Sequence, residues 1–395
     1  MIAEPRPAGS APASVLARRP AWAVVDHDAI ADNVAELVRL VAPAAVCAVV
    51  KADAYGHGAV EVARTALAAG ASWLAVAMAG EAAVLRASGL TAPVLVLGEP
   101  SPAEWDDAVA LDLRVTLHHL AAVAGVGAAA RAAGRRTSVH LKVDTGMHRI
   151  GAAPADAVAL ADAVAAHPAL VLEGVWTHCP VADEPGNPFT EEQTGRFDDV
   201  VRSLRSAGHD PALVHAANSA AALDHPALRH DLVRCGISVY GLEPSPALRG
   251  RLPLRPALTL AAAITNVAVV PAGDAVSYGL RRPCRVDTVV ATVPLGYADG
   301  VPRRLAEVGG EVLVAGERRP FAGTITMDQL LVDCGPAGSP AADATETGDE
   351  VVLLGRQGAA VVDVSEWAER LGTITYEITC GISPRVPRRH VGRAR

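Results

Sequence analysis

Two patterns of hydrophobic and polar positions divide the chain. Between about residues 43 and 245, short runs rich in Val and Leu alternate with longer Ala-rich stretches of helical period. The first unit is AVCAVVKADAYG followed by VEVARTALAAG, and the last is LVRCGISVYGL. Eight such units in roughly 200 residues predict a (β/α)8 barrel. An open doubly wound sheet is the alternative, but it usually has fewer units and a Gly-rich first turn, which is absent.

Beyond about residue 250 the pattern changes to strands broken by Gly and Pro. Segments such as TVVATVPLGYADG, EVLVAGERRPFAG and DEVVLLG predict a mostly-β domain over residues 251–395. The fold class is therefore α/β, with an N-terminal TIM-type barrel over residues 20–250. An early strand, AWAVVDHDAI, precedes the first barrel unit and is a candidate to join the β-domain's sheet. Residues 1–19 contain no apolar run and read as a disordered tail.

Length, charge and cysteine content narrow the class of protein. A chain of 395 residues is long enough for two domains. Its net charge of −8 argues against nucleic acid or an anionic membrane as a partner. No run reaches the roughly 18 apolar residues of a membrane span. The six cysteines form no CxxC pair, so neither a metal site nor a disulfide framework is expected. We expect a soluble cytoplasmic protein.

The lysine count is the most informative feature of the composition. Of the 35 basic residues only Lys51 and Lys142 are lysines, which leaves 33 arginines. Where arginine is the default cation, a retained lysine suggests a task that a guanidinium cannot perform. Losing a proton to act as an amine nucleophile or base is such a task.

Polar residues end most of the predicted barrel strands. In a barrel of this kind the chemistry lies on the loops after the strands, so these residues should share one pocket. A lysine, several cations and small residues with accessible amides suit an anionic cofactor that carries an aldehyde, and pyridoxal phosphate fits that description. The residues concerned are Lys51, Tyr55, Lys142, Asp144, Arg149, Thr177, His178, Asn218, Ser219, Arg234, Gly236 and Ile237.

Several motifs carry a resemblance to a known family. AVVKADAYGHG, HLKVDTGMHRIG, ANSAA, VRCGISVYG, VSYG, PLGYADG, TMDQ and YEITCGISPRVPR occur in collinear order over about residues 20–390. Together they resemble alanine racemases of the barrel-plus-β-domain type. AVVKADAYGHG alone is highly specific, whereas a lone SYG would mean nothing.

The resemblance implies roles for particular residues. Lys51 would hold pyridoxal phosphate as the internal aldimine and serve as one catalytic base, and Tyr278 of the partner subunit would be the other. Arg234 would bond the pyridine nitrogen. Lys142 would carry a carbamate that orients Arg149, and Arg149, Met327 and Asp328 would lie at the substrate. The remaining cofactor contacts would come from Tyr55, His178, Asn218, Ser219, Gly236, Ile237 and Tyr376.

The implied reaction is the interconversion of L- and D-alanine by two bases in a homodimer with shared active sites, supplying D-alanine for peptidoglycan. The sequence departs from the family pattern at His148, Cys179, Pro180 and Thr324. A racemase for another small amino acid in secondary metabolism therefore stays open. A related barrel decarboxylase would place a carboxylate where Arg234 stands, and a non-enzymatic cofactor-binding protein would lack the domain that carries Tyr278.

Overall fold

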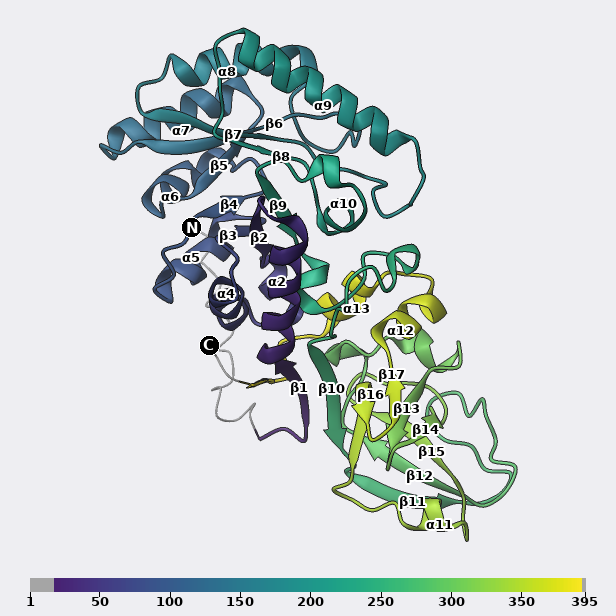
Figure 1. The fold of residues 1–395 in the computed structure, drawn as a ribbon. Coiled ribbons are helices and arrows are strands. Elements are labelled where there is room, and N and C mark those ends of the chain that lie inside the picture. Colours follow the sequence, from purple (N-terminus) through teal and green to yellow (C-terminus); the bar gives the residue numbers. More distant parts are fainter. Residues whose placement is uncertain (1–17, 393–395) are drawn as a thin grey trace. The chain divides into compact units, whose positions relative to one another are not determined.

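The computed structural model describes residues 18–392 (Figure 1). The tail predicted for residues 1–19 therefore lies almost entirely outside the described residues. Within the described part, the chain has no helix that combines the length and the apolarity needed to cross a bilayer. The chain forms two compact units, one of residues 26–257 and one that joins the residues before Asp26 to Leu258–Val391.

The first unit is built on eight parallel strands, which confirms the predicted fold class. Their order is β8-β7-β6-β5-β4-β3-β2-β9. Between β8 and β9 the ring is completed by backbone hydrogen bonds, from the Asp231 amide to Val214 O at 3.0 Å and from the Arg234 amide to Ala217 O at 2.9 Å. The strands are β2 (Ala45–Val49), β3 (Trp73–Val76), β4 (Val94–Val96), β5 (Arg114–Leu117), β6 (Thr137–Lys142), β7 (Leu170–Trp176), β8 (Leu213–His215) and β9 (Leu232–Cys235).

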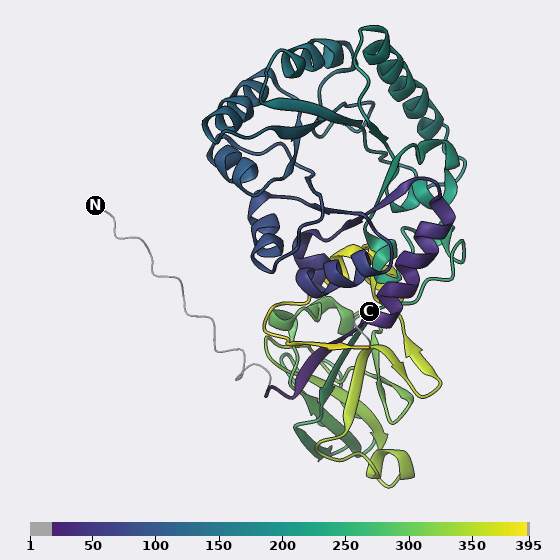
Figure 2. The same ribbon diagram turned by 60° about the vertical axis from the view of Figure 1, so that its left-hand side comes forward.

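Helices surround this ring of strands (Figure 2). Most are rich in alanine, the residue with the highest helix propensity, and bury one face. Asp26 caps the first helix by accepting the amides of Asp28 and Ala29. The helices are α2 (His27–Val41), α3 (Lys51–Gly56), α4 (Ala59–Ala68), α5 (Ala79–Ala87), α6 (Trp105–Ala110), α7 (Leu120–Ala132), α8 (Ala157–Ala165), α9 (Phe189–Ser206) and α10 (Ser219–Asp224), with a 3-10 turn η4 (Ile237–Tyr240) after β9.

The second unit contains a seven-stranded sheet of order β14-β13-β16-β10-β1-β18, with β17 beside β16, and a three-stranded sheet of order β11-β12-β15. Alternation along β15 buries Leu330, Val332 and Cys334. The elements are β1 (Ala21–Asp26), β10 (Leu258–Ala263), β11 (Asn266–Val270), β12 (Thr288–Val293), β13 (Glu311–Val314), β14 (Glu317–Pro320), β15 (Leu330–Pro336), β16 (Glu350–Gln357), β17 (Ala360–Val362), β18 (Arg388–Val391), α11 (Pro340–Asp343), α12 (Val364–Leu371) and α13 (Thr375–Gly381).

The boundary between the two units falls between residues 257 and 258 of the sequence, rather than between the expected 250 and 251. The segment before Leu258 stays with the barrel unit because the Ala257 amide donates to Tyr240 O and the Arg255 amide to Asn33 Oδ1. Residues 20–25 belong to the β unit, so the early strand joins the β-domain's sheet as expected, whereas the expected start of the barrel at residue 20 was wrong. These residues belong there because β1 pairs antiparallel with β10, with Ala21 opposite Ala262.

Gly241 and Gly250, both in the segment after the last barrel strand, have similar backbone angles but very different packing. Gly241 and Gly250 have φ of +80° and +77°, but a Cβ on Gly241 would lie 1.7 Å from Arg255 O, whereas one on Gly250 meets nothing within 4 Å. We expect Gly250→Ala to lower the free energy of unfolding by about 1–2 kcal/mol, the cost of left-handed backbone. Gly241→Ala should cost at least about twice as much, because the backbone at residue 255 must also move. Equal losses in urea unfolding would contradict this packing.

Candidate active site

Lys51 directly follows β2 and begins a short left-handed turn. The four residues after it, Ala52 to Tyr55, have φ between 51° and 54°, and none is glycine. Each such residue costs roughly 1–2 kcal/mol relative to right-handed backbone. A turn of this kind persists only where its surroundings fix it.

Two carboxylates fix the turn. Glu81 on α5 accepts the Ala52 amide at 2.6 Å through one oxygen and the Ala77 amide at 2.7 Å through the other. Asp53, inside the turn, accepts the Ala59 amide at 2.8 Å where α4 begins. The turn therefore holds Lys51 at the carboxyl end of β2 and directs Tyr55 toward the end of β9.

Tyr55 lies against a polar cradle formed by the last two strands. Its ring is 4.9 Å from that of Tyr240, whose hydroxyl donates to Val49 O at 2.8 Å. A Cβ on Gly236 would lie 2.4 Å from the Tyr55 hydroxyl oxygen, so any larger residue there would displace that hydroxyl. The Gly236 amide donates to Ser219 Oγ at 2.9 Å. Two hydroxyls and a backbone amide, all from residues predicted to share one pocket, thus meet in one place.

The residues beside the cradle are held by their own hydrogen bonds. Asn218 caps α10 by accepting the Ala221 amide at 3.0 Å, and its Nδ2 donates to Cys179 O at 3.3 Å. Ile237 begins the 3-10 turn after β9 and is fully buried. Cys179 is also buried, which raises the pKa of its thiol to about 11 and keeps it neutral.

Arg234 on β9 is a buried cation without a carboxylate partner among the hydrogen bonds of the described residues. Its Nη2 donates to Thr177 O at 2.8 Å and Ala216 O at 2.9 Å. Its Nη1 donates to His215 Nδ1 at 2.9 Å, and Nη2 lies 3.3 Å from His178 Nδ1. Burial lowers the pKa of the guanidinium to about 10, so that Arg234 still carries its charge at neutral pH.

A chain of hydrogen bonds leads from Arg234 through the barrel interior. An arginine can only donate, so His215 Nδ1 must accept and its proton is on Nε2. His215 Nε2 lies 2.9 Å from His140 Nδ1, which accepts in turn, and His140 Nε2 donates to Glu173 at 3.0 Å. Burial lowers the pKa of both histidines, which keeps them neutral. His215, His140 and Glu173 were not among the residues predicted from the sequence. His140 lies two residues before Lys142 on β6, so the alternation of strand residues places both on the same face.

Lys142 at the end of β6 lies among other cations. Its Nζ is 4.5 Å from the centre of the Trp176 ring, and Arg234 Cζ is 4.6 Å from the same centre. Burial, together with the positive charges of Arg234, Arg149 and Lys51, lowers the pKa of Lys142 to about 7. Burial and the same cations hold the pKa of His178 well below its ordinary value. These predicted barrel residues therefore lie close enough for Arg234, Arg149 and Lys51 to lower the pKa of Lys142 and of His178.

The loop between Lys142 and Arg149 explains one departure from the family pattern. Asp144 accepts the amides of Gly146 at 2.9 Å and His148 at 3.1 Å. His148 has φ of +55°, in the region that favours glycine, and its ring is exposed and lies 3.3 Å from Asp144. Histidine therefore occupies a glycine-type position, with the Asp144 carboxylate partly offsetting the strain.

The other predicted residues lie in the β unit. The Tyr278 side chain is 76% exposed, and Tyr278 lines an open cavity of about 390 Å³ with Ser277, Thr326, Gln329 and Leu331. Met327 is also exposed, and Tyr376 lies in the first turn of α13. Asp328, expected near a substrate, pairs with Arg385 at 2.6 Å.

Thr324, another departure from the family pattern, supports the Tyr278 segment. Its hydroxyl donates to Tyr278 O at 2.9 Å, and Ser277 Oγ donates to Thr324 O at 2.6 Å. This reciprocal pair fixes the backbone on which Tyr278 stands while its side chain faces solvent.

An (β/α)8 barrel with an amine, a polar cradle and buried cations at the carboxyl ends of its strands, joined to a β unit, defines a two-domain barrel enzyme. The chain belongs to the alanine racemase family. Models of the alanine racemase N-terminal and C-terminal domains match residues 25–244 and 257–390.

Individual relatives extend over nearly the whole chain. The alanine racemase of Symbiobacterium thermophilum is 44% identical over 374 residues, covering 95% of this chain and 98% of its own. The crystal structure of alanine racemase from Streptomyces lavendulae is 43% identical, with a TM-score of 0.89 and coverage of 95% and 98%. A histidine racemase from Leuconostoc mesenteroides is 28% identical, with a TM-score of 0.84 and coverage of 95% and 99%.

Proposed function

We propose that the chain is an alanine racemase that interconverts L- and D-alanine with bound pyridoxal phosphate. The observation that carries the proposal is the arrangement of Lys51, the cradle at Gly236 and the buried Arg234 on one barrel rim of an alanine-racemase-family chain. The D-alanine would serve peptidoglycan synthesis.

The residues present fit the cofactor. Tyr55, Ser219 and Gly236 form a cradle that a Cβ at residue 236 would fill, and it suits a phosphate. Lys51 would hold the cofactor covalently and His178 would lie along its ring. Bound pyridoxal phosphate supplies an electron-withdrawing ring that makes the Cα proton of an amino acid acidic. Asn218, Ile237 and Tyr376 would complete the phosphate contacts.

Arg234 would face the pyridine nitrogen, and its protonation decides between the candidate reactions. A guanidinium that keeps its proton can only donate a hydrogen bond, so it leaves that nitrogen unprotonated. The neutral His215 and His140 support this state, because the hydrogen-bond chain supplies only acceptors to Arg234. A barrel decarboxylase would instead need a carboxylate at residue 234. Arg234 thus favours the racemase and limits side reactions that need a stronger electron sink.

Racemisation needs one group to remove the Cα proton on one face and another to return a proton on the opposite face. Lys51 would act on one face and the partner subunit's Tyr278 on the other. Arg149 and Met327 would contact the substrate. The Thr324 and Ser277 hydrogen bonds would keep the Tyr278 phenol positioned without occupying its hydroxyl.

The test separates the two bases by stereochemistry. Exchange of the Cα proton with D₂O is measured for each alanine enantiomer separately. Tyr278→Phe should lower exchange of one enantiomer by roughly 10²–10⁴-fold and spare the other, because only one face loses its base. Lys51→Ala should weaken both, because it also loses the cofactor attachment. Equal loss for both enantiomers in Tyr278→Phe would rule out two bases.

Substrate range is tested with the wild-type chain. L-alanine should racemise faster than other small amino acids and faster than L-histidine, the substrate named for the Leuconostoc relative. Preference for another amino acid would place the chain among racemases of different specificity, while leaving the two-base test intact.

A homodimer with shared sites is the second part of the proposal. The exposure of Tyr278 and Met327 supports it, and so does the open cavity that Tyr278 lines with Thr326, the residue before Met327, since exposed large apolar side chains gathered in one place are typical of an interface. Mixing Lys51→Ala with Tyr278→Phe under subunit exchange should restore up to about a quarter of wild-type activity, because half of the dimers are then hybrids with one intact site. Each variant treated alone is the control. No recovery despite demonstrated exchange would refute shared sites.

Lys142 would carry a carbamate that orients Arg149. Its pKa of about 7 supports this, because carbon dioxide reacts with the neutral amine. ¹³C-bicarbonate should give a carbamate resonance in the wild type and in Lys51→Ala, the only other lysine in the chain, but none in Lys142→Ala. The neutral amine, and the signal with it, should fall about tenfold per pH unit below 7. A signal that survives Lys142→Ala would refute the assignment.

A further inference from the structure

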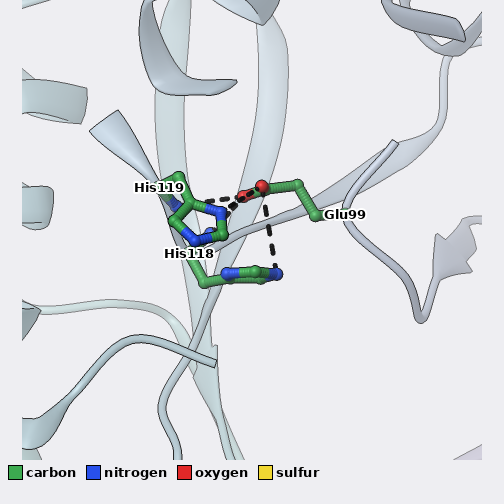
Figure 3. Close-up of side chains that lie close together, drawn as sticks. All are labelled: Glu99, His118 and His119. Atoms are coloured by element: carbon green, nitrogen blue, oxygen red, sulfur yellow. Dashed lines mark hydrogen bonds and ion pairs between the residues drawn. The ribbon is translucent and has the colours of Figure 1, made fainter. Parts of the chain in front are cut away.

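Three side chains meet at the ends of two neighbouring barrel strands, away from the cradle. Glu99 follows β4, and His118 and His119 follow β5. Figure 3 shows both imidazole rings beside the Glu99 carboxylate. One nitrogen from each ring and one carboxylate oxygen all lie within 4.8 Å of one another. Neither the racemase chemistry nor the cofactor cradle uses these residues.

The distances are close to those of a metal centre. Glu99 Oε1 is 2.7 Å from His119 Nδ1 and 3.9 Å from His118 Nε2. Ligands about 2.0–2.2 Å from a tetrahedral Zn²⁺ lie roughly 3.3 Å apart, between these two values. The His119 side chain is 66% exposed and can turn, so that small rotations would bring all three atoms to an ion.

The carboxylate is already oriented for this task. Glu99 Oε2 accepts the backbone amides of His118 at 2.6 Å and His119 at 3.0 Å. These bonds occupy one oxygen and leave Oε1 facing the two rings. Hydrogen bonds that orient a ligand in this way are typical of metal sites, where they contribute to affinity.

We propose that Glu99, His118 and His119 form a binding site for one divalent transition-metal ion of the Zn²⁺ type. Two imidazole nitrogens and one carboxylate oxygen suit Zn²⁺ and its neighbours, whereas Mg²⁺ and Ca²⁺ prefer oxygen ligands throughout. Water would complete the coordination on the exposed side of His119. The two histidines follow β5, which is the neighbour of β6, the strand that ends at Lys142; Leu117 of β5 pairs with Leu141 of β6.

A simpler explanation makes different predictions. Glu99 could serve only to accept the amides at the start of α7 and to pair with His119. Glu99→Gln separates the two explanations, because the glutamine oxygen can still accept both amides but is a much poorer metal ligand. His119→Ala tests the exposed imidazole without opening the barrel core.

The experiment is titration of the tag-free holoenzyme with Zn²⁺ in a calorimeter. We expect one ion per chain in the wild type, and affinity at least about 10²-fold weaker in His119→Ala and in Glu99→Gln. His209→Ala is the control at a second histidine–carboxylate pair. His209 pairs with Asp162 at 2.7 Å, but this pair belongs to no three-ligand cluster among the described residues.

Melting temperature gives a second measurement. Zn²⁺ should raise it in a concentration-dependent manner in the wild type and in His209→Ala, because a ligand that binds only the folded state stabilises it. The rise should be absent in His119→Ala. Absence of saturable binding to the wild type, or binding unchanged in both His119→Ala and Glu99→Gln, would overturn the proposal. Racemase activity is not the readout, so failure here would be distinct from failure of the proposed function.

Discussion

The barrel interior depends on the buried Arg234 guanidinium, which has no carboxylate partner among residues 18–392. A buried cation needs acceptors for its donors, and here they are two strand-end carbonyls and neutral imidazole nitrogens. Arg234 can only donate hydrogen bonds, and this fixes the tautomers of His215 and His140. Glu173 at the far end accepts the last hydrogen bond of the chain, from His140 Nε2. A second proton on either histidine would turn its Nδ1 from an acceptor into a donor, and one hydrogen bond of the chain would be lost.

The same charge acts on the side chains around it. Arg234 contributes to the lowered pKa of Lys142 and of His178. The rim therefore carries fewer positive charges at neutral pH than it has basic side chains. A lysine that is partly neutral near pH 7 is chemically different from the other cations around it. At residue 142 this gives a physical reason for a lysine in a chain with 33 arginines, because a guanidinium would keep its proton there.

In each unit, hydrogen bonds from neighbouring side chains fix the backbone beside a residue predicted to be catalytic. In the barrel, the left-handed turn after Lys51 costs free energy that the bonds of Glu81 and Asp53 offset, and the turn brings Tyr55 to Gly236. In the β unit, Thr324 and Ser277 fix the backbone at Tyr278 and leave the phenol exposed. Two residues that depart from the family pattern therefore have definite contacts: Thr324 donates to the Tyr278 backbone, and the His148 amide donates to Asp144.

The sequence by itself determined the eight barrel strands, the change to a β unit and most of the rim residues, because periodicity and the position of polar residues after buried strands are local properties. It also singled out Lys51 and Lys142 by composition. The tertiary structure alone decided the long-range features. These are the partner and register of β1 in the sheet that it was expected to join, the hydrogen-bond chain from Arg234 to Glu173, and the meeting of Glu99 with His118 and His119. Each joins residues from different strands or loops, and which side chains meet there depends on strand order and register, which no local pattern encodes.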